Sequence, residues 1–169
     1  MDVRRLGPGD ATAYRELRLR GLKEHPDAFT SSYEEDCAKP LAASEARLAP
    51  ESADVVYGAF AAGTLAGVAG LAREPRAKNR HKALVFGMYV APEHRRLGIA
   101  AALVRHIIGE ARRQPGLEQL VLTVTQTNTA ARMLFESLGF RSFGLEPRAL
   151  RDGDGYFDKN HMIRFLAPS

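Results

Sequence analysis

The feature that most constrains the fold is an apolar strand that leads through a short turn into a long amphipathic helix. Residues 83–90 form a near-continuous apolar run, which is typical of a strand buried on both faces of a sheet. Pro92 ends this strand, and apolar side chains then recur at helical spacing from Ile99 to Ala111. A β-rich segment, residues 120–124, follows the helix. Strand, helix and strand in this order predict a crossover connection with parallel pairing of the two strands.

The rest of the chain predicts short helices and antiparallel hairpins around this unit. Two helical regions are expected near the N-terminus, at about residues 10–25 and 32–48, with Lys39-Pro40 interrupting the second. The other expected elements are a strand at 2–6, a hairpin at 55–60 and 65–71, a helix at 131–138 ended by Gly139, and a last hairpin at 140–150 and 156–165. The order β-α-α-β-β-β-α-β-α-β-β is satisfied by an α/β fold with a mixed sheet and helices on both faces.

Length and composition fit a single domain spanning residues 1–169. No apolar run approaches the roughly 20 residues of a membrane helix, and the first residues lack the apolar segment of a secretory signal. We therefore expect a cytoplasmic protein without a membrane partner. Cys37 is the only cysteine, which excludes an internal disulfide and a cysteine-built metal site, and we expect no metal. The basic stretch at residues 78–82 has no interleaved aromatic residues, so we expect no nucleic-acid partner.

The sharpest local feature is the turn between the buried strand and the helix, which reads Arg-Arg-Leu-Gly-Ile-Ala from Arg95. Gly98 lacks a Cβ, so the backbone can approach a ligand closely, and the first turn of the helix offers unpaired N–H donors and a partial positive charge. Arg95 and Arg96 can add charge-assisted hydrogen bonds, and together these groups predict a pyrophosphate site. The simpler alternative is a loop in which Gly98 only permits a tight turn and the arginines are solvated.

Two segments carry a resemblance to a known family. Residues 88–100 contain Arg95, two residues, Gly98, one residue and Ala100 between a strand and a helix, and they resemble the cofactor motif of the GNAT acetyltransferases. Residues 128–140, Asn-Thr-Ala-Ala-Arg-Met-Leu-Phe-Glu-Ser-Leu-Gly-Phe, are similar to the second signature of that family, Asn-x-x-Ala followed by an aromatic residue and Gly-Phe. The order of the expected elements also fits this family from end to end.

The resemblance implies that acetyl-CoA is the cosubstrate. It implies that backbone N–H groups of residues 96–101 hold the pyrophosphate, and that backbone groups of Met88 and Val90 pair with the pantetheine arm and the acetyl carbonyl. It also implies that the strands before and after the long helix separate to admit the thioester. Asn128 is expected near the cofactor, or as the cap of its own helix, or both. The implied cofactor-binding residues are Met88, Tyr89, Val90, Arg95, Arg96, Leu97, Gly98, Ile99, Ala100, Ala101, Asn128 and Phe135.

Several residues are candidates for the acid and the base of the reaction. Phe135 stands where many members of the family carry the tyrosine that protonates the leaving thiolate, so that role is absent here or taken by another group. Phe135 itself is expected as a core aromatic residue or as a wall of the thioester channel. Transfer to an amine requires a base, and the candidates are Glu34 and Tyr33 in the second helical region and Tyr156 near the last strand. Weaker candidates are Glu35, His94, Asp158 and His161, whereas Glu146 and Arg148 are expected to form sheet-edge salt bridges.

The acceptor is expected to be a primary amine, and a small molecule is favoured because no peptide-docking feature is visible. A protein N-terminus or a lysine side chain is the alternative acceptor. A further alternative is a regulatory module that binds acyl-CoA without turnover, which the phenylalanine at position 135 supports. Edge strands predicted near the C-terminus leave both a monomer and a homodimer open.

Overall fold

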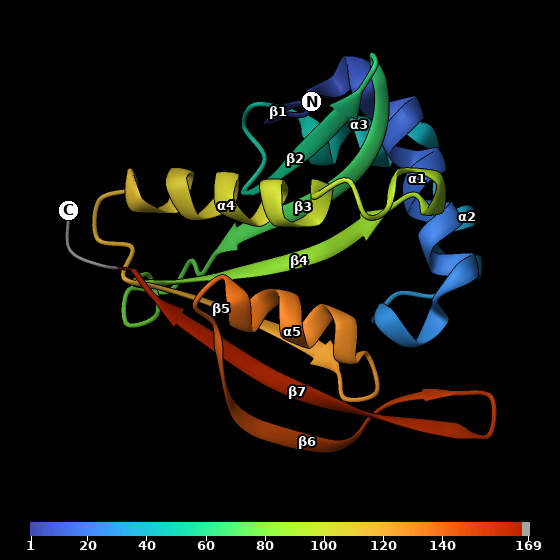
Figure 1. Cartoon of the computed structure of the whole chain (residues 1–169). Coiled ribbons are helices and arrows are strands. Elements are labelled where there is room, and N and C mark those ends of the chain that lie inside the picture. Colours follow the sequence, from blue (N-terminus) through green and yellow to red (C-terminus); the bar gives the residue numbers. More distant parts are fainter. Residues whose placement is uncertain (167–169) are drawn as a thin grey trace.

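The computed structural model describes residues 1–166, which form seven strands and five α-helices (Figure 1). The strands are β1 (Asp2–Arg5), β2 (Asp54–Ala61), β3 (Thr64–Arg73), β4 (Lys82–Val90), β5 (Gln119–Thr125), β6 (Arg141–Asp152) and β7 (Gly155–Phe165). The helices are α1 (Ala11–Glu24), α2 (Tyr33–Cys37), α3 (Leu41–Leu48), α4 (Ile99–Arg112) and α5 (Thr129–Ser137). The predicted order of elements is confirmed, and Lys39-Pro40 separates α2 from α3 as expected.

All seven strands lie in one mixed sheet in the order β1-β2-β3-β4-β5-β7-β6. β4 and β5 pair in parallel, as the crossover through α4 predicts, and all other neighbours are antiparallel. Helices α4 and α5 cover one face of the sheet, while α1 and α3 cover the other, which confirms the mixed α/β class (Figure 1). Within residues 1–166, no helix combines the length and the apolar character that a membrane crossing requires.

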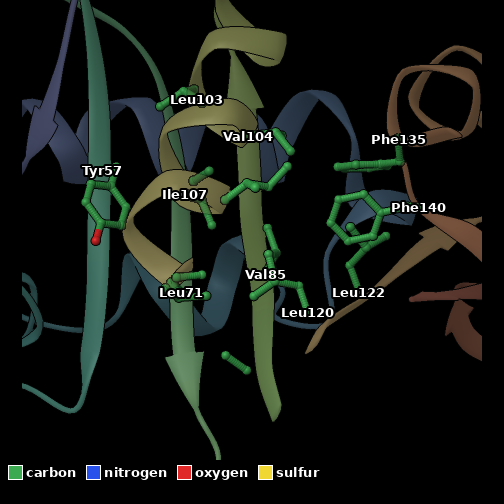
Figure 2. Packing of buried hydrophobic residues seen from close by; sticks show 14 of the residues in the cluster. Tyr57, Leu71, Val85, Leu103, Val104, Ile107, Leu120, Leu122, Phe135 and Phe140 are labelled. Atoms are coloured by element: carbon green, nitrogen blue, oxygen red, sulfur yellow. The ribbon is translucent and has the colours of Figure 1, made fainter. Parts of the chain in front are cut away.

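Each face of the sheet has its own apolar core. On the α4 face, Leu103, Val104 and Ile107 are fully buried because the apolar positions of α4 recur at helical spacing (Figure 2). They pack over β3 and β4, and the same cluster continues through β5 to α5. On the other face, Tyr14 and Leu17 of α1 pack against the sheet in a second, smaller cluster. The sheet is therefore held between two apolar layers.

The sheet opens where β4 and β5 separate. The two strands pair over only three positions, from Lys82 opposite Gln119 to Leu84 opposite Val121. Beyond these pairs, β4 continues to Val90 without pairing to β5 along that edge. The separation that the resemblance implied is therefore present, and it positions the candidate site.

A β-bulge in β4 lies beside this opening. Val68 of β3 pairs with Tyr89, whereas Gly70 pairs with Phe86, so one residue of β3 faces two residues of β4, Gly87 and Met88. Gly87 has a φ of +62°, a conformation that favours glycine. The bulge bends the strand at the opening and interrupts the regular pairing of its backbone groups. Sequence reasoning did not predict it, because Gly87 lies inside an otherwise regular apolar run.

Candidate functional site

The centre of the candidate site is a small cavity of about 90 Å³ in the opening between β4 and β5. Both strands line it, β4 with residues 85–88 and β5 with residues 122–125. Phe135, from the core on the α4 face, and Phe29, which packs against the core on the α1 face, also line it. Residues that belong to the two apolar cores therefore meet at this opening.

The turn between the end of β4 and the start of α4 presents unpaired amide groups. Arg96 and Gly98 have φ angles of +63° and +75°, and Gly98 is the N-cap of α4 without any side-chain capping bond. Among the described residues, the N–H groups of Arg96, Leu97 and Gly98 donate to no acceptor, and the first N–H groups of a helix have none within the helix. Successive N–H groups in such a turn, at the positive end of a 14-residue helix, form an anion site.

The two arginines of the turn differ in what they contact. Arg95 contacts the ends of both β4 and α1. Its Nε donates to the Val90 carbonyl oxygen at 3.1 Å, and its Nη2 lies 3.2 Å from Nε2 of His25, the residue that follows α1. Arg96 is exposed and forms no hydrogen bond or ion pair within residues 1–166. Of the two predicted phosphate ligands, Arg96 is therefore the one whose side chain is free to reach an anion at the turn.

The β4 residues assigned to the cofactor also differ in whether their side chains are available to a ligand. The Tyr89 side chain is buried on the α1 face, and its hydroxyl donates to Glu24 Oε2 at 2.6 Å. Burial and this hydrogen bond raise the pKa of Tyr89 to about 12. Only the backbone of Tyr89 is thus available to a ligand. Met88 lines the opening itself, and Val90 stands at the end of the strand, before the 3₁₀ turn Pro92–His94.

Asn128 and Phe135 both line the opening and both have structural roles. The Asn128 side chain accepts a hydrogen bond from the Ala131 N–H at 3.1 Å, which confirms it as the N-cap of α5. Phe135 is 5% exposed and packs edge to face on Phe140, with 5.6 Å between the ring centres (Figure 2). The two expectations for Phe135, a core residue and a wall of the channel, are therefore compatible.

A second, larger cavity of about 330 Å³ adjoins the opening, and we call it the basic cavity. The residues that it shares with the smaller cavity are Ala28, Phe29, Val85, Phe86, Gly87 and Thr123. Its charged lining residues are Arg18, Arg47, Asp54 and Lys159. Sequence reasoning did not single out any of these four, because they lie on α1, α3, β2 and β7 and no spacing in the sequence links them.

Lys159 is the most unusual of these residues because it is a lysine with only 5% exposure. Its Nζ donates to Thr125 Oγ1 at 3.1 Å, and the Asp27 carbonyl oxygen lies 3.5 Å away. Burial lowers the pKa of Lys159, and nearby carboxylates offset this only in part. Strand alternation could have indicated an inward-facing lysine in β7, but alternation alone does not show what the side chain meets.

The candidate bases lie farther from the opening. Tyr33 and Glu34 line a third cavity, of about 450 Å³, which Leu150, Arg151 and Asp152 of β6 also line. It shares residues 29–31 with the basic cavity. Glu35 instead completes the capping box of α2, where it accepts from the Ser32 N–H at 3.0 Å.

Tyr156 and its neighbours lie on the β6–β7 hairpin. Tyr156 is half exposed, and the guanidinium groups of Arg148 and Arg151 lie 4.8 and 5.7 Å from the centre of its ring. It lines none of the three cavities described above. The structure therefore does not bring Tyr156 into one cavity with Tyr33 and Glu34.

The weaker candidates have partners of their own. Glu146 Oε2 lies 2.8 Å from His161 Nε2, so the sheet-edge partner of Glu146 is a histidine. Arg148 forms no ion pair within residues 1–166, which corrects the expectation of a salt bridge, and its N–H donates to Asp158 Oδ1 at 2.8 Å. Its side chain instead packs on Tyr156. His94 lies in the 3₁₀ turn before the anion site.

Comparisons with known proteins agree with this geometry. A family model described as acetyltransferase (GNAT) family matches residues 19–140. The [ribosomal protein bS18]-alanine N-acetyltransferase of Escherichia coli (strain K12) is 35% identical over 77 residues, which are 46% of this chain and 51% of that protein. The chain thus matches about half the length of this curated relative.

Solved structures match over nearly the whole chain. A GCN5-related N-acetyltransferase from Kribbella flavida is 26% identical with a TM-score of 0.81, and the match covers 98% of this chain and 97% of that one. A putative acetyltransferase from Salmonella typhimurium, solved with its cofactor acetyl-CoA, is 24% identical with a TM-score of 0.80, and the match covers 98% and 94%. The second of these likenesses shows the fold alone.

Proposed function

This chain belongs to the acetyltransferase (GNAT) family, and we propose that it transfers the acetyl group of acetyl-CoA directly to the primary amine of a small molecule. The observation that carries the proposal is the opening between β4 and β5, which residues of both apolar cores line. It lets a thioester approach from the α4 face while an amine approaches from the α1 face. Such an arrangement suits direct transfer, in which both substrates are bound at once.

Several features of the chain fit acetyl-CoA. The turn from Arg96 to Gly98, with unpaired N–H groups and no side-chain cap on α4, suits the pyrophosphate. The unpaired edge of β4 around Met88 and Val90 can pair with the amides of the pantetheine arm, as a neighbouring strand would. Phe135 and Asn128 then border the acetyl end of the cosubstrate.

The reaction sets three requirements for the residues around the opening. The amine nitrogen must be neutral to attack the thioester carbonyl carbon, and deprotonating an alkyl amine at pH 7 costs about 4 kcal/mol for roughly three pKa units. The carbonyl oxygen gains negative charge during the attack, and we assign its stabilisation to a main-chain N–H of β4 near Val90. The carbon–sulfur bond then breaks, and the thiolate of CoA leaves.

We assign the proton transfers to groups other than residue 135, because Phe135 has no hydroxyl. Glu34 is the carboxylate that we propose as the base. It lines the third cavity, which adjoins the basic cavity, and we propose that it accepts the proton of the amine through a water molecule. Tyr33, beside it, is a weaker choice because its contact with the Cys37 thiol raises the pKa of the phenol. Tyr156 is the weakest, because its ring is packed between arginines on the hairpin.

A protein N-terminus is a second candidate acceptor. Similarity to a ribosomal-protein alanine N-acetyltransferase favours it, and the third cavity, of about 450 Å³ between α2 and the β6–β7 hairpin, is where we place the chain end. A binding module without turnover is the remaining alternative. All three candidate functions predict that the protein binds acetyl-CoA. They differ in whether the protein then acetylates a small amine, a protein N-terminus or nothing.

The test is a calorimetric titration with acetyl-CoA followed by turnover with a panel of amines and peptides, with products identified by mass spectrometry. We expect micromolar binding and acetylation of small amines. Acetylation of peptides alone would favour the second candidate. Binding without any acetylated product would favour the regulatory module, and no binding would contradict the proposal as a whole.

A further inference from the structure

The charges of the basic cavity are unbalanced. Arg18, Arg47 and Lys159 line it with three positive groups, and Asp54 is the one carboxylate among its lining residues. The whole chain of 169 residues carries a net charge of only +4, so a surplus of two positive charges in one cavity is a strong local concentration. A cavity of this kind favours an anionic group in its ligand.

An ion pair with Asp36 orients Arg18, and one of its terminal nitrogens has no acceptor within residues 1–166. Its Nε donates to Asp36 Oδ2 at 2.5 Å, and Lys39 also donates to Asp36, at 3.1 Å. The opposite end of the guanidinium points toward the β4 bulge, where a Cβ on Gly87 would lie 3.6 Å from Nη1. Within residues 1–166, Arg18 Nη1 donates to no acceptor. The Asp36 contact thus orients Arg18 without using the donor that faces the cavity.

Arg47 also has a donor that is not used. Its Nε is buried and has no acceptor in the described part of the chain. Its contact with Asp54 is long, with 3.5 Å between Nη2 and Oδ2, and its guanidinium lies over the Phe86 ring at 4.8 Å. The Nη1 of Arg47 donates to no acceptor within residues 1–166, and the side chain is 31% exposed, so this donor is available to an oxygen atom of a ligand.

Lys159 closes the cavity on the β7 side. Its acceptors, Thr125 Oγ1 and the Asp27 carbonyl oxygen, are both neutral. No carboxylate of residues 1–166 lies within ion-pair distance of its Nζ. The positive charge of Lys159 therefore adds to that of the two arginines when the side chain is protonated.

We propose that the basic cavity binds the carboxylate of the acceptor, so that the substrates are small molecules carrying both a primary amine and a carboxylate, such as free amino acids. This inference rests on the proposed acetyl transfer to a small amine. Two guanidinium groups with unused N–H donors match the planar carboxylate. Because the cavity shares Gly87 and Thr123 with the opening, a carboxylate held on Arg18 and Arg47 directs the amine toward the thioester.

The same charges select against other amines and assist the chemistry. A simple alkyl ammonium or a polyamine would enter a cavity lined by Arg18, Arg47 and Lys159 with like charge, which disfavours its binding. In an amino acid, the carboxylate offsets this repulsion. The nearby cations then lower the pKa of the bound amine, which favours the neutral nucleophile that the reaction requires.

The experiment compares matched acceptors with the unaltered protein and acetyl-CoA. Each free amino acid is tested beside its carboxamide and its decarboxylated amine, with spermidine and short peptides as further arms. We expect kcat/KM to be at least about tenfold higher for the amino acid than for either counterpart that lacks the carboxylate, as for a charged hydrogen bond worth about 1.4 kcal/mol. Equal or faster acetylation of the carboxamides, of spermidine or of peptides would overturn the inference and leave the proposed acetyl transfer standing.

Variants show whether the basic cavity is responsible. We expect Arg47→Gln to raise KM for the preferred amino acid about tenfold with little change in kcat or in acetyl-CoA affinity. Arg76→Gln, at an exposed position on the β3–β4 connection, removes the same charge outside the cavity and should change neither constant. Arg18→Gln should act as Arg47→Gln does, but it breaks the Asp36 ion pair, so Arg47 is the primary variant.

A binding measurement separates failure of this inference from failure of acetyl transfer. Amino acids are titrated calorimetrically into the protein with CoA present, using unaltered protein and Arg47→Gln. Arg47-dependent binding without any acetylation would support the carboxylate site and contradict the proposed function. No binding and no acetylation of any amino acid would overturn the inference.

Discussion

Lys159 on β7 donates a hydrogen bond of 3.1 Å to the hydroxyl of Thr125 on β5, and that hydroxyl donates to the Asp27 carbonyl oxygen at 2.6 Å. This chain of bonds joins the end of β5, which borders the opening, to the segment that follows α1. It places an ammonium group among neutral partners in the interior of the protein. The consequence is a measurable dependence of stability on pH.

The first prediction concerns this buried lysine. Because burial lowers the pKa of Lys159 below 10.5, the unfolded chain binds more protons than the folded chain between the lowered value and 10.5. The contribution of Lys159 to the free energy of unfolding therefore rises with pH across this window. At pH values below the window, Lys159 is charged in the folded protein and the full cost of burying that charge is present. We expect Lys159→Met to remove this contribution, so that its stability advantage over the unaltered protein shrinks toward pH 10.5. Urea unfolding of both proteins from pH 7 to 10.5 measures this, and parallel curves would contradict it.

The second prediction concerns the missing hydroxyl at position 135. Phe135 is buried against Phe140 and also borders the small cavity in the opening. We expect Phe135→Tyr to keep or raise kcat, since it restores a proton donor for the thiolate. Phe135→Ala should instead lower the free energy of unfolding by about 3–5 kcal/mol. A folded Phe135→Tyr protein with a large loss of kcat would show that the ring packs where no hydroxyl fits.

The features that follow from local sequence were predictable. Helix α4 repeats its apolar residues at helical spacing, Asn128 caps α5, and Pro40 interrupts the second helical region. Each of these depends on residues within a few positions of one another, so pattern and propensity are sufficient. The parallel pairing of β4 with β5 followed in turn from the crossover through α4.

The features that depend on tertiary contacts were not predictable. Arg18, Arg47 and Lys159 come together only because α1, α3 and β7 meet around one cavity, and each looks like an ordinary surface charge in the sequence. The bulge at Gly87 arises from a register shift against β3, which a single strand pattern does not encode. The sequence places Tyr33 and Glu34 in a helical region and Tyr156 on a strand, but only the tertiary structure shows that Tyr156 lies outside the cavity that the other two line.

The third prediction tests the base with two neighbouring glutamates. Glu34 lines the third cavity, whereas Glu35 accepts from the Ser32 N–H in the capping box, a role that glutamine also fills. We expect Glu34→Gln to lower kcat at pH 7 by about 100-fold, the lower range for loss of a general base. Glu35→Gln serves as the control and should leave kcat and stability unchanged. Equal activity of the two variants over pH 6–9 would exclude Glu34 as the base.

The fourth prediction concerns the anion site, and it separates charge from backbone strain. Gly98 has a φ of +75°, and a Cβ there would meet no atom within 4 Å, so a side chain would project into the space before α4. Gly63, in the β2–β3 turn, has a φ of +80° and equally open surroundings, and it lines none of the three cavities of the site. Glutamate at either position adds the same charge and a similar strain of about 1–2 kcal/mol.

Only Gly98→Glu should abolish acetyl-CoA binding, because it places a carboxylate at the N–H groups that are proposed to hold the pyrophosphate. We expect at least about a 100-fold loss of affinity by calorimetry, the equivalent of about 2.7 kcal/mol. Gly63→Glu should bind as the unaltered protein does. Gly98→Ala adds strain without charge, so it should retain most of the affinity. If Gly98→Glu is folded and binds normally, the pyrophosphate does not lie at this turn, whereas equal losses in both glutamate variants would indicate a general effect of strain.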